Sequence, residues 1–150
     1  MYSTILTIHS LVRWIALAAG VAATMAALTG SDKRTDRLGL LLMIALDVQM
    51  LLGLILYLVL SPYTSQAIED FRAALQNPQM RFWVVEHTAT MLGAVIVVHG
   101  GRVLVLKTEA AADKRTRRIV CFAIATVGMI LGMPWPGLPY GRPLIRWSLG

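Results

Sequence analysis

The sequence predicts an all-α integral membrane protein in which four helices form an antiparallel, up-and-down bundle. Hydrophobic residues make up 57% of the 150 residues and charged residues 15%, against about 45–50% and about 25% in soluble domains. The excess apolar residues fall into four blocks, each near the length that crosses ~30 Å of hydrocarbon. Residues 1–150 therefore form a single four-helix transmembrane domain, with no room for a soluble one.

The basic residues between the blocks predict the orientation in the membrane. The loops after the first and third blocks carry Lys33, Arg34, Arg37, Arg102, Lys107, Lys114, Arg115, Arg117 and Arg118. The opposite side carries only Arg72, Arg81, Arg142 and Arg146. By the positive-inside rule, both termini lie outside the cytoplasm. The net charge of +6 is then a topology signal, and no nucleic-acid partner is expected.

The first block covers residues 4–28 and is expected to be a retained helix, because neither a positive segment nor a convincing cleavage site accompanies it. His9 and Arg13 are four residues apart and share one face of this helix. The same face continues in small residues, namely Ala16, Gly20, Ala23 and Ala27. Small residues at this spacing admit either a neighbouring helix or a flat cofactor, and the sequence leaves both open.

The second block, residues 39–60, contains Asp47 near mid-depth. Arg13 lies at a similar depth on an antiparallel helix, so an Arg13–Asp47 ion pair is predicted to keep both charges in the membrane. A functional role for Asp47 is given equal weight. Gln49 is expected to hydrogen-bond between helices. Beyond this block, residues 66–76 show the spacing of a short amphipathic helix on the membrane surface.

The third block, residues 81–106, is the most polar of the long apolar segments. It carries His87 near one end and His99 near the other, ~120° apart around the helix, so the two do not serve one site. We expect His99 at the surface or among lipid headgroups. The fourth block, residues 119–133, closes the bundle. The tail, residues 134–150, is rich in Pro, Gly, Trp, Tyr and Arg and suits the headgroup region.

The first and third blocks run in the same direction, and His9 and His87 each lie a few residues after entry from the non-cytoplasmic side. We therefore expect them at similar depth, where two imidazoles can ligate one haem iron from both sides. Arg13 and Arg81 are expected to pair with the propionates. Glu86 is a candidate for hydrogen bonding behind a ligand or for proton uptake. With no second matched pair of histidines, at most one haem b is predicted.

Three alternatives remain open at this point. The two histidines can simply pack and hydrogen-bond at the interface. A copper ion is another candidate, because His and Met bind copper and Met91 lies one turn from His87. The third alternative is a cofactor-free structural or accessory subunit, whose small-residue face on the first helix meets a partner. Covalent c-type haem is excluded, because Cys-x-x-Cys-His is absent from the sequence.

Several short segments carry a family resemblance: TIHSLVRW at 7–14, DVQMLLG at 47–53, RFWVVEH at 81–87 and MPWP at 133–136. Together they resemble small bacterial four-helix membrane proteins labelled cytochrome b-like, and the resemblance spans nearly the whole chain. It implies haem b, electron transfer, and His9 and His87 as the positions carried over. It also implies a multi-pass protein of the bacterial inner (cytoplasmic) membrane. The expected partners are membrane lipid, quinone, and a partner subunit or second copy.

Overall fold

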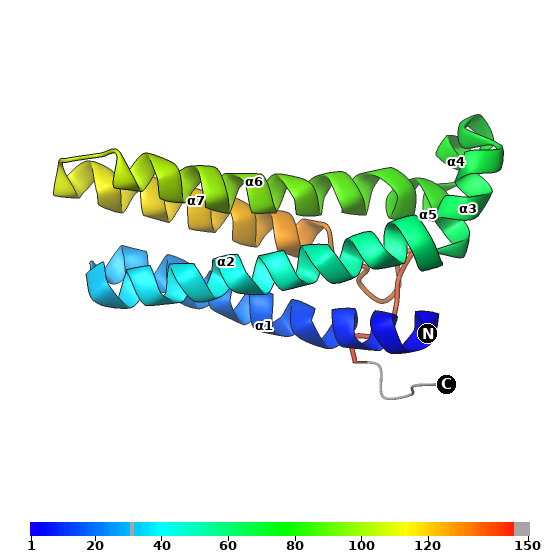
Figure 1. Ribbon diagram of the computed structural model, residues 1–150, viewed down its shortest axis with the longest axis horizontal. Helices are drawn as coiled ribbons and strands as arrows, with labels where there is room; N and C mark the ends of the chain where they lie inside the picture. The colour runs from blue at the N-terminus through cyan, green and yellow to red at the C-terminus, as the bar shows by residue number, and fades with distance from the viewer. Residues whose placement is uncertain (31, 146–150) are drawn as a thin grey trace.

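The computed structural model describes residues 1–30 and 32–145, and within these ranges the chain is helical, with no strand. Four long helices lie side by side (Figure 1): α1 (Tyr2–Thr29), α2 (Asp32–Ile55), α6 (His87–Leu106) and α7 (Ala111–Leu131). Two π-helical turns, η1 (Leu56–Leu60) and η2 (Phe82–Glu86), continue α2 and lead into α6. Between them come the short helices α3 (Pro62–Glu69), α4 (Phe71–Gln76) and α5 (Pro78–Arg81).

Within the described residues, three segments are long and apolar enough to cross a membrane: Tyr2–Thr29, Asp32–Leu60 and Pro78–Leu106. The all-helical class predicted from the sequence is confirmed, and these three segments are its candidate membrane spans. The apolar part of α7, from residue 119 onward, follows a charged first half. At ~1.5 Å per residue it covers only about 20 Å, less than the ~30 Å hydrocarbon core. The predicted fourth span is therefore the shorter, apolar half of a longer helix.

The packing places α1 and α6 diagonally across from each other. Helix α1 packs against α2 and α7, and α6 packs against α7 and α2. At one end of the molecule α1 and α6 end and α2 and α7 begin, whereas α1 begins at the other end, which also carries α3, α4 and α5 (Figure 1). The beginnings of α1 and α6 consequently share the end that carries α3, α4 and α5.

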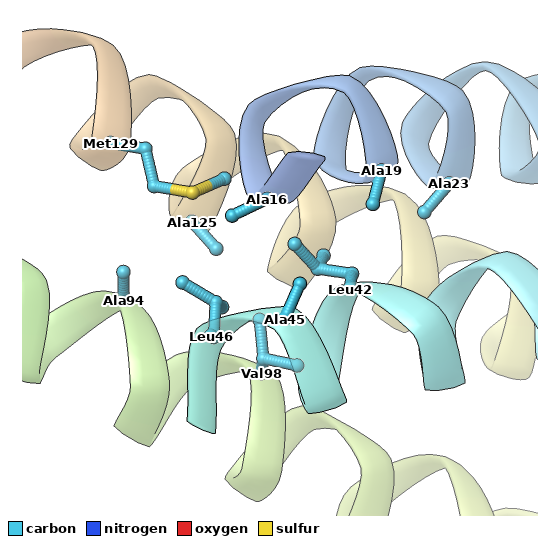
Figure 2. Close-up of a cluster of buried hydrophobic side chains, with 10 residues drawn as sticks. All are labelled: Ala16, Ala19, Ala23, Leu42, Ala45, Leu46, Ala94, Val98, Ala125 and Met129. Atoms are coloured by element: carbon cyan, nitrogen blue, oxygen red, sulfur yellow. The ribbon is translucent and has the colours of Figure 1, made fainter. Parts of the chain in front are cut away.

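The small residues predicted along one face of α1 form a close-packing surface. Figure 2 shows Ala16 and Ala23 in the main buried cluster with side chains of α2, α6 and α7; its members are Ala16, Ala19, Ala23, Leu42, Ala45, Leu46, Ala94, Val98, Ala125 and Met129. A Cβ at Gly20 would lie 2.6 Å from Thr126 Oγ1, so α1 and α7 pack too closely for a larger residue at this position. Because neighbouring helices cover this face, it is open neither to a partner protein nor, beyond Ala16, to a flat cofactor.

Arginines near the start of α7 tie that helix to the ends of α1 and α2. Arg118 donates to Asp32 Oδ1 at 2.6 Å and to Asp36 Oδ1 at 2.7 Å. Arg115 Nε donates to the carbonyl of Ala27 at 3.2 Å. That carbonyl belongs to the last turn of α1, where carbonyl groups lack helical partners. The charged half of α7 therefore closes the connected end of the helices.

Adjacent glycines on α6 give a matched test of the α6–α7 contact. A Cβ at Gly101 would lie 2.5 Å from Cys121 Sγ, whereas a Cβ at Gly100 would meet nothing within 4 Å. We expect Gly101→Ala to lower the free energy of unfolding by about 1–3 kcal/mol through overpacking. Gly100→Ala should keep or raise it, because alanine is about 0.8–1 kcal/mol better than glycine within a helix. Circular dichroism during denaturation in detergent measures both, and equal losses would contradict the tight contact.

The segment predicted as one amphipathic helix over 66–76 consists instead of α3 and α4, which meet at Asp70. The carboxylate of Asp70 accepts a hydrogen bond from the Ala73 N–H at 2.9 Å and so caps the second helix. Ile68 and Phe71 remain 80% and 54% exposed. These two helices therefore carry an exposed apolar surface at this end of the molecule.

The tail folds back over the end of the molecule where α1 and α6 begin. The Arg142 N–H donates to the Pro134 carbonyl at 3.0 Å, and the Tyr140 ring stacks on Phe82 with centroids 3.6 Å apart. The sequence places residues 134–150 only in the headgroup region. In the structure, the tail up to residue 145 covers the site described next.

Candidate functional site

The structure brings His9 and His87 together from diagonal helices. Their ring centroids are 6.3 Å apart and the ring planes are inclined by 73°. His9 lies in the third turn of α1, and His87 is the first residue of α6 after the π-helical turn η2. π-helical turns are frequent at functional sites. The two rings meet in the interior at the end covered by the tail.

One nitrogen of His87 is held by a backbone carbonyl. His87 Nδ1 lies 2.7 Å from the carbonyl oxygen of Gly132, which directly follows the last residue of α7. A carbonyl can only accept, so Nδ1 carries the proton and donates. Nε2 of the neutral ring then keeps its lone pair for a metal ion.

The His9 ring faces a glycine on α2. A Cβ at Gly53 would lie 3.4 Å from His9 Cε1, so a larger residue there would press on the imidazole. Gln49 Nε2 donates to the His9 carbonyl at 2.9 Å, which realises the interhelical hydrogen bond expected of this glutamine. The ring itself is less constrained, because Nδ1 is buried without a partner in the described chain.

Unpartnered polar atoms are concentrated around the histidine pair. Within residues 1–30 and 32–145, the buried side-chain nitrogen and oxygen atoms without a hydrogen bond are His9 Nδ1, Arg13 Nε, Gln49 Oε1 and Trp83 Nε1. All four belong to residues that line cavities beside the pair. Most buried polar groups in proteins are hydrogen-bonded, so each exception calls for a bound group, a water or a functional reason. Their clustering identifies this region as the candidate site.

Two small cavities, of about 90 Å³ and 50 Å³, flank the pair. The residues that line both are Leu6, His9, Leu46, Gln49, Trp83, His87, Met91 and Arg142. The first extends between α2 and α6 towards Tyr57 and Val95, and the second extends towards Arg13 and Met129. The histidine pair therefore lies between one space towards α2 and another towards α7.

Arg142 is a cation of this site that the sequence-based reasoning used only for topology. Its guanidinium carbon lies 4.3 Å from the centroid of the Trp83 ring, and Nη2 donates to the Tyr2 hydroxyl at 3.4 Å. Arg13 lines the second cavity and donates to the carbonyls of Pro143 and Leu144. In the sequence, the only signal that the chain returns to the histidine pair is the tail rich in Pro, Gly and aromatic residues.

Arg81 and Glu86 do not take the places predicted for them beside the cofactor. They form an ion pair, with 2.6 Å between Arg81 Nε and Glu86 Oε1, and their side chains are 46% and 44% exposed. Neither lines either cavity. The pair spans the π-helical turn η2, in which residues five apart are stacked. In this packing, neither side chain reaches the cavities where the sequence places a propionate and a partner of His87.

The predicted Arg13–Asp47 ion pair does not form, because both side chains have other partners. Asp47 Oδ1 lies 3.3 Å from His99 Nε2, while Arg13 turns towards the tail carbonyls. His99 Nδ1 also lies 3.1 Å from the Val95 carbonyl, so His99 takes part in an interhelical contact while its side chain remains 43% exposed. The reason is rotational: Asp47 faces α6 across the α2–α6 groove, away from α1.

Comparisons with known proteins give no family: no family model matches the chain, and neither a curated protein nor a solved structure matches it. In the part of the chain that the structure describes, no group of three or more His, Cys, Asp or Glu side chains is placed to hold a metal ion. What the site offers is two imidazoles, two nearby guanidinium groups and largely apolar walls.

Proposed function

We propose that this chain is a membrane-embedded electron-transfer protein that binds one haem b, with His9 and His87 as the axial ligands of the iron. The observation that carries the proposal is the separation of the two ring centroids, 6.3 Å. Metal–imidazole bonds of about 2.0–2.1 Å put two rings on opposite sides of one ion with centres roughly 6 Å apart. The diagonal positions of α1 and α6 suit ligands that face each other across the helices.

The ligand set also favours haem over an ion held by protein alone. Porphyrin nitrogens fill the equatorial positions of haem iron, so the protein supplies only axial ligands. Two histidines are then sufficient, although the described residues contain no larger ligand group. The contact of His87 Nδ1 with the Gly132 carbonyl is the kind of hydrogen bond that a metal-bound histidine makes with its second nitrogen.

The cavities constrain how a porphyrin would enter. Their volumes, about 90 Å³ and 50 Å³, are below the ~300–1,000 Å³ of typical ligand pockets. Side chains must therefore move before a macrocycle fits. Leu6, Met91 and Arg142 line both spaces, and Met and Arg have flexible unbranched side chains. The proposal accordingly includes outward movement of these side chains when the cofactor binds.

Haem iron, when bound, supplies reversible one-electron chemistry. His9 and His87 would hold the iron, apolar walls would exclude water, and Arg13 and Arg142 would provide guanidinium groups for the propionates. In the proposed topology, an antiparallel four-helix bundle of a bacterial cytoplasmic membrane has both termini outside the cytoplasm. Electrons would then be exchanged with quinone or a partner subunit near that side.

An optical spectrum of the purified, detergent-solubilised protein from haem-replete cells tests the proposal. A Soret band, with sharp α and β bands after dithionite reduction, is the expected result. A colourless protein would overturn the haem assignment. It would favour the cofactor-free accessory subunit, whose polar groups would then serve only to hold helices together.

A bound copper ion is the second candidate, and the position of Met91 favours it. Met91 lines both cavities together with His9 and His87, and thioether and imidazole ligands suit Cu(I). A single ion also needs no larger space than the existing cavities. Metal analysis of the same preparation separates the two candidates. With copper, Met91→Leu should lower the metal content about tenfold or more, whereas with haem the absorption bands should persist in this variant.

A further inference from the structure

A cavity larger than either of the two beside the histidine pair lies at the opposite end of the molecule. It measures about 430 Å³ and is bounded by α2, α6 and the first half of α7. This volume lies within the ~300–1,000 Å³ range of small-molecule sites. Its lining includes none of the residues that line the two histidine cavities, so it is a separate site.

Unpaired positive charge surrounds this cavity. Arg37, Arg102 and Lys114 line it and are exposed or half-buried, and the charged side chain of none of them makes a hydrogen bond or ion pair with residues 1–30 or 32–145. The acidic residue in the lining, Asp36, is already paired with Arg118 at 2.7 Å. The uncompensated charge at the cavity is therefore cationic.

The inner walls are apolar. They are formed by Leu40 and Met43 of α2, Val98 and Val105 of α6, and Phe122 of α7. Glycine lets the helices approach behind them: a Cβ at Gly39 would lie 2.6 Å from Phe122 Cζ. A ligand that satisfies both parts of the cavity carries an anionic group at the rim and a hydrocarbon segment inside.

We propose that this cavity binds one anionic phospholipid, with its phosphate at Arg37, Arg102 and Lys114 and a hydrocarbon chain against the apolar walls. The candidate spans Tyr2–Thr29 and Pro78–Leu106 end near this cavity, and Asp32–Leu60 begins there. Basic pockets between membrane helices on the cytoplasmic side bind acidic headgroups, and this end is the one assigned to the cytoplasm by its basic loops. A free phosphate ion would use only the rim. The proposal is independent of the histidine site.

Native mass spectrometry of the detergent-solubilised full chain tests it, with phosphatidylglycerol, phosphatidylcholine of the same acyl chains, and inorganic phosphate as the probes. We expect each chain to retain one phosphatidylglycerol molecule. Phosphatidylcholine should bind more weakly, by about tenfold or more. Arg37→Gln/Arg102→Gln should weaken phosphatidylglycerol binding by about tenfold or more, since each cation near the surface contributes to lipid attraction. Inorganic phosphate should displace none of it.

Matched variants keep the result interpretable. Arg37→Lys/Arg102→Lys preserves both charges and should retain the lipid. Arg72→Gln/Arg81→Gln removes two cations from the opposite end of the molecule and should have no effect. Val105→Trp places a larger side chain in the apolar part of the cavity without removing charge, so it should weaken lipid binding. This variant still tests the proposal if the Arg37→Gln/Arg102→Gln variant does not fold.

Three outcomes would overturn the proposal. Equal retention of phosphatidylglycerol and phosphatidylcholine would show that the cationic rim does not select the headgroup. Equal losses in the Arg37/Arg102 and Arg72/Arg81 glutamine variants would show that binding follows overall charge. Displacement of the lipid by inorganic phosphate would identify a site for a soluble anion instead.

Discussion

Alanine at position 87 is expected to abolish the Soret and reduced α and β bands of the protein, and alanine at position 9 should do the same. Each substitution removes one of the two rings whose centroids are 6.3 Å apart. His87→Ala also removes the group that contacts the Gly132 carbonyl. Loss of a residue that merely supports a metal ligand costs ~10–100-fold in affinity, so loss of the ligand itself should lower haem content at least tenfold.

The third histidine of the chain is the control for this experiment. His99 pairs with Asp47 and lines neither histidine cavity. In His99→Gln, the glutamine amide keeps a donor for the carboxylate, and the spectrum should match that of the unaltered protein. Circular dichroism shows whether each variant is folded. Haem bands that persist in folded His9→Ala or His87→Ala would contradict the assignment of that residue as a ligand.

Arg142→Gln is expected to weaken haem binding by about 10–100-fold, while Arg81→Gln leaves it unchanged. Hydrogen bonds to charged groups contribute about 1.5–3 kcal/mol, which corresponds to that range of affinity. Arg142 lines both cavities beside the histidines, so its guanidinium is placed to meet a propionate. Arg81 forms an ion pair with Glu86 on the exposed surface.

Titration of haem into the cofactor-depleted protein, followed at the Soret band, measures both affinities. Arg142→Lys keeps the charge but loses the planar fork of the guanidinium, so it should recover only part of the affinity. A larger effect at position 81 than at 142 would restore the role predicted from the sequence. Equal effects would mean that neither arginine contacts the cofactor and that net charge alone matters.

The helical class and the approach of the two histidines follow from local properties of the sequence. Apolar blocks of span length define where helices run, because backbone polar groups in lipid must be satisfied within the helix. His9 and His87 stand a few residues after the starts of two blocks of the same direction. A constant rise of ~1.5 Å per residue then gives them similar depth. The depth of a residue in the membrane can therefore be predicted from its position within its apolar block.

Contacts that depend on rotation about a helix axis were not readable in this way. The matching depths of Asp47 and Arg13 predict an ion pair, but Asp47 faces α6 and meets His99. The sequence predicts Arg81 beside the cofactor, but the π-helical turn η2 places it on Glu86. A shift from regular α-helical spacing within one turn leaves hydropathy unchanged and redirects every side chain after it.

By itself, the sequence determined an all-helical chain with membrane-length segments, and it singled out His9 and His87. Only the tertiary structure decided that α2 and α7 pack against the small residues of α1. It also decided that the tail brings Arg142 to the histidines. The division has one physical reason. Burial in a membrane is encoded residue by residue, whereas the neighbours of a side chain depend on helix rotation and on segments more than a hundred residues away.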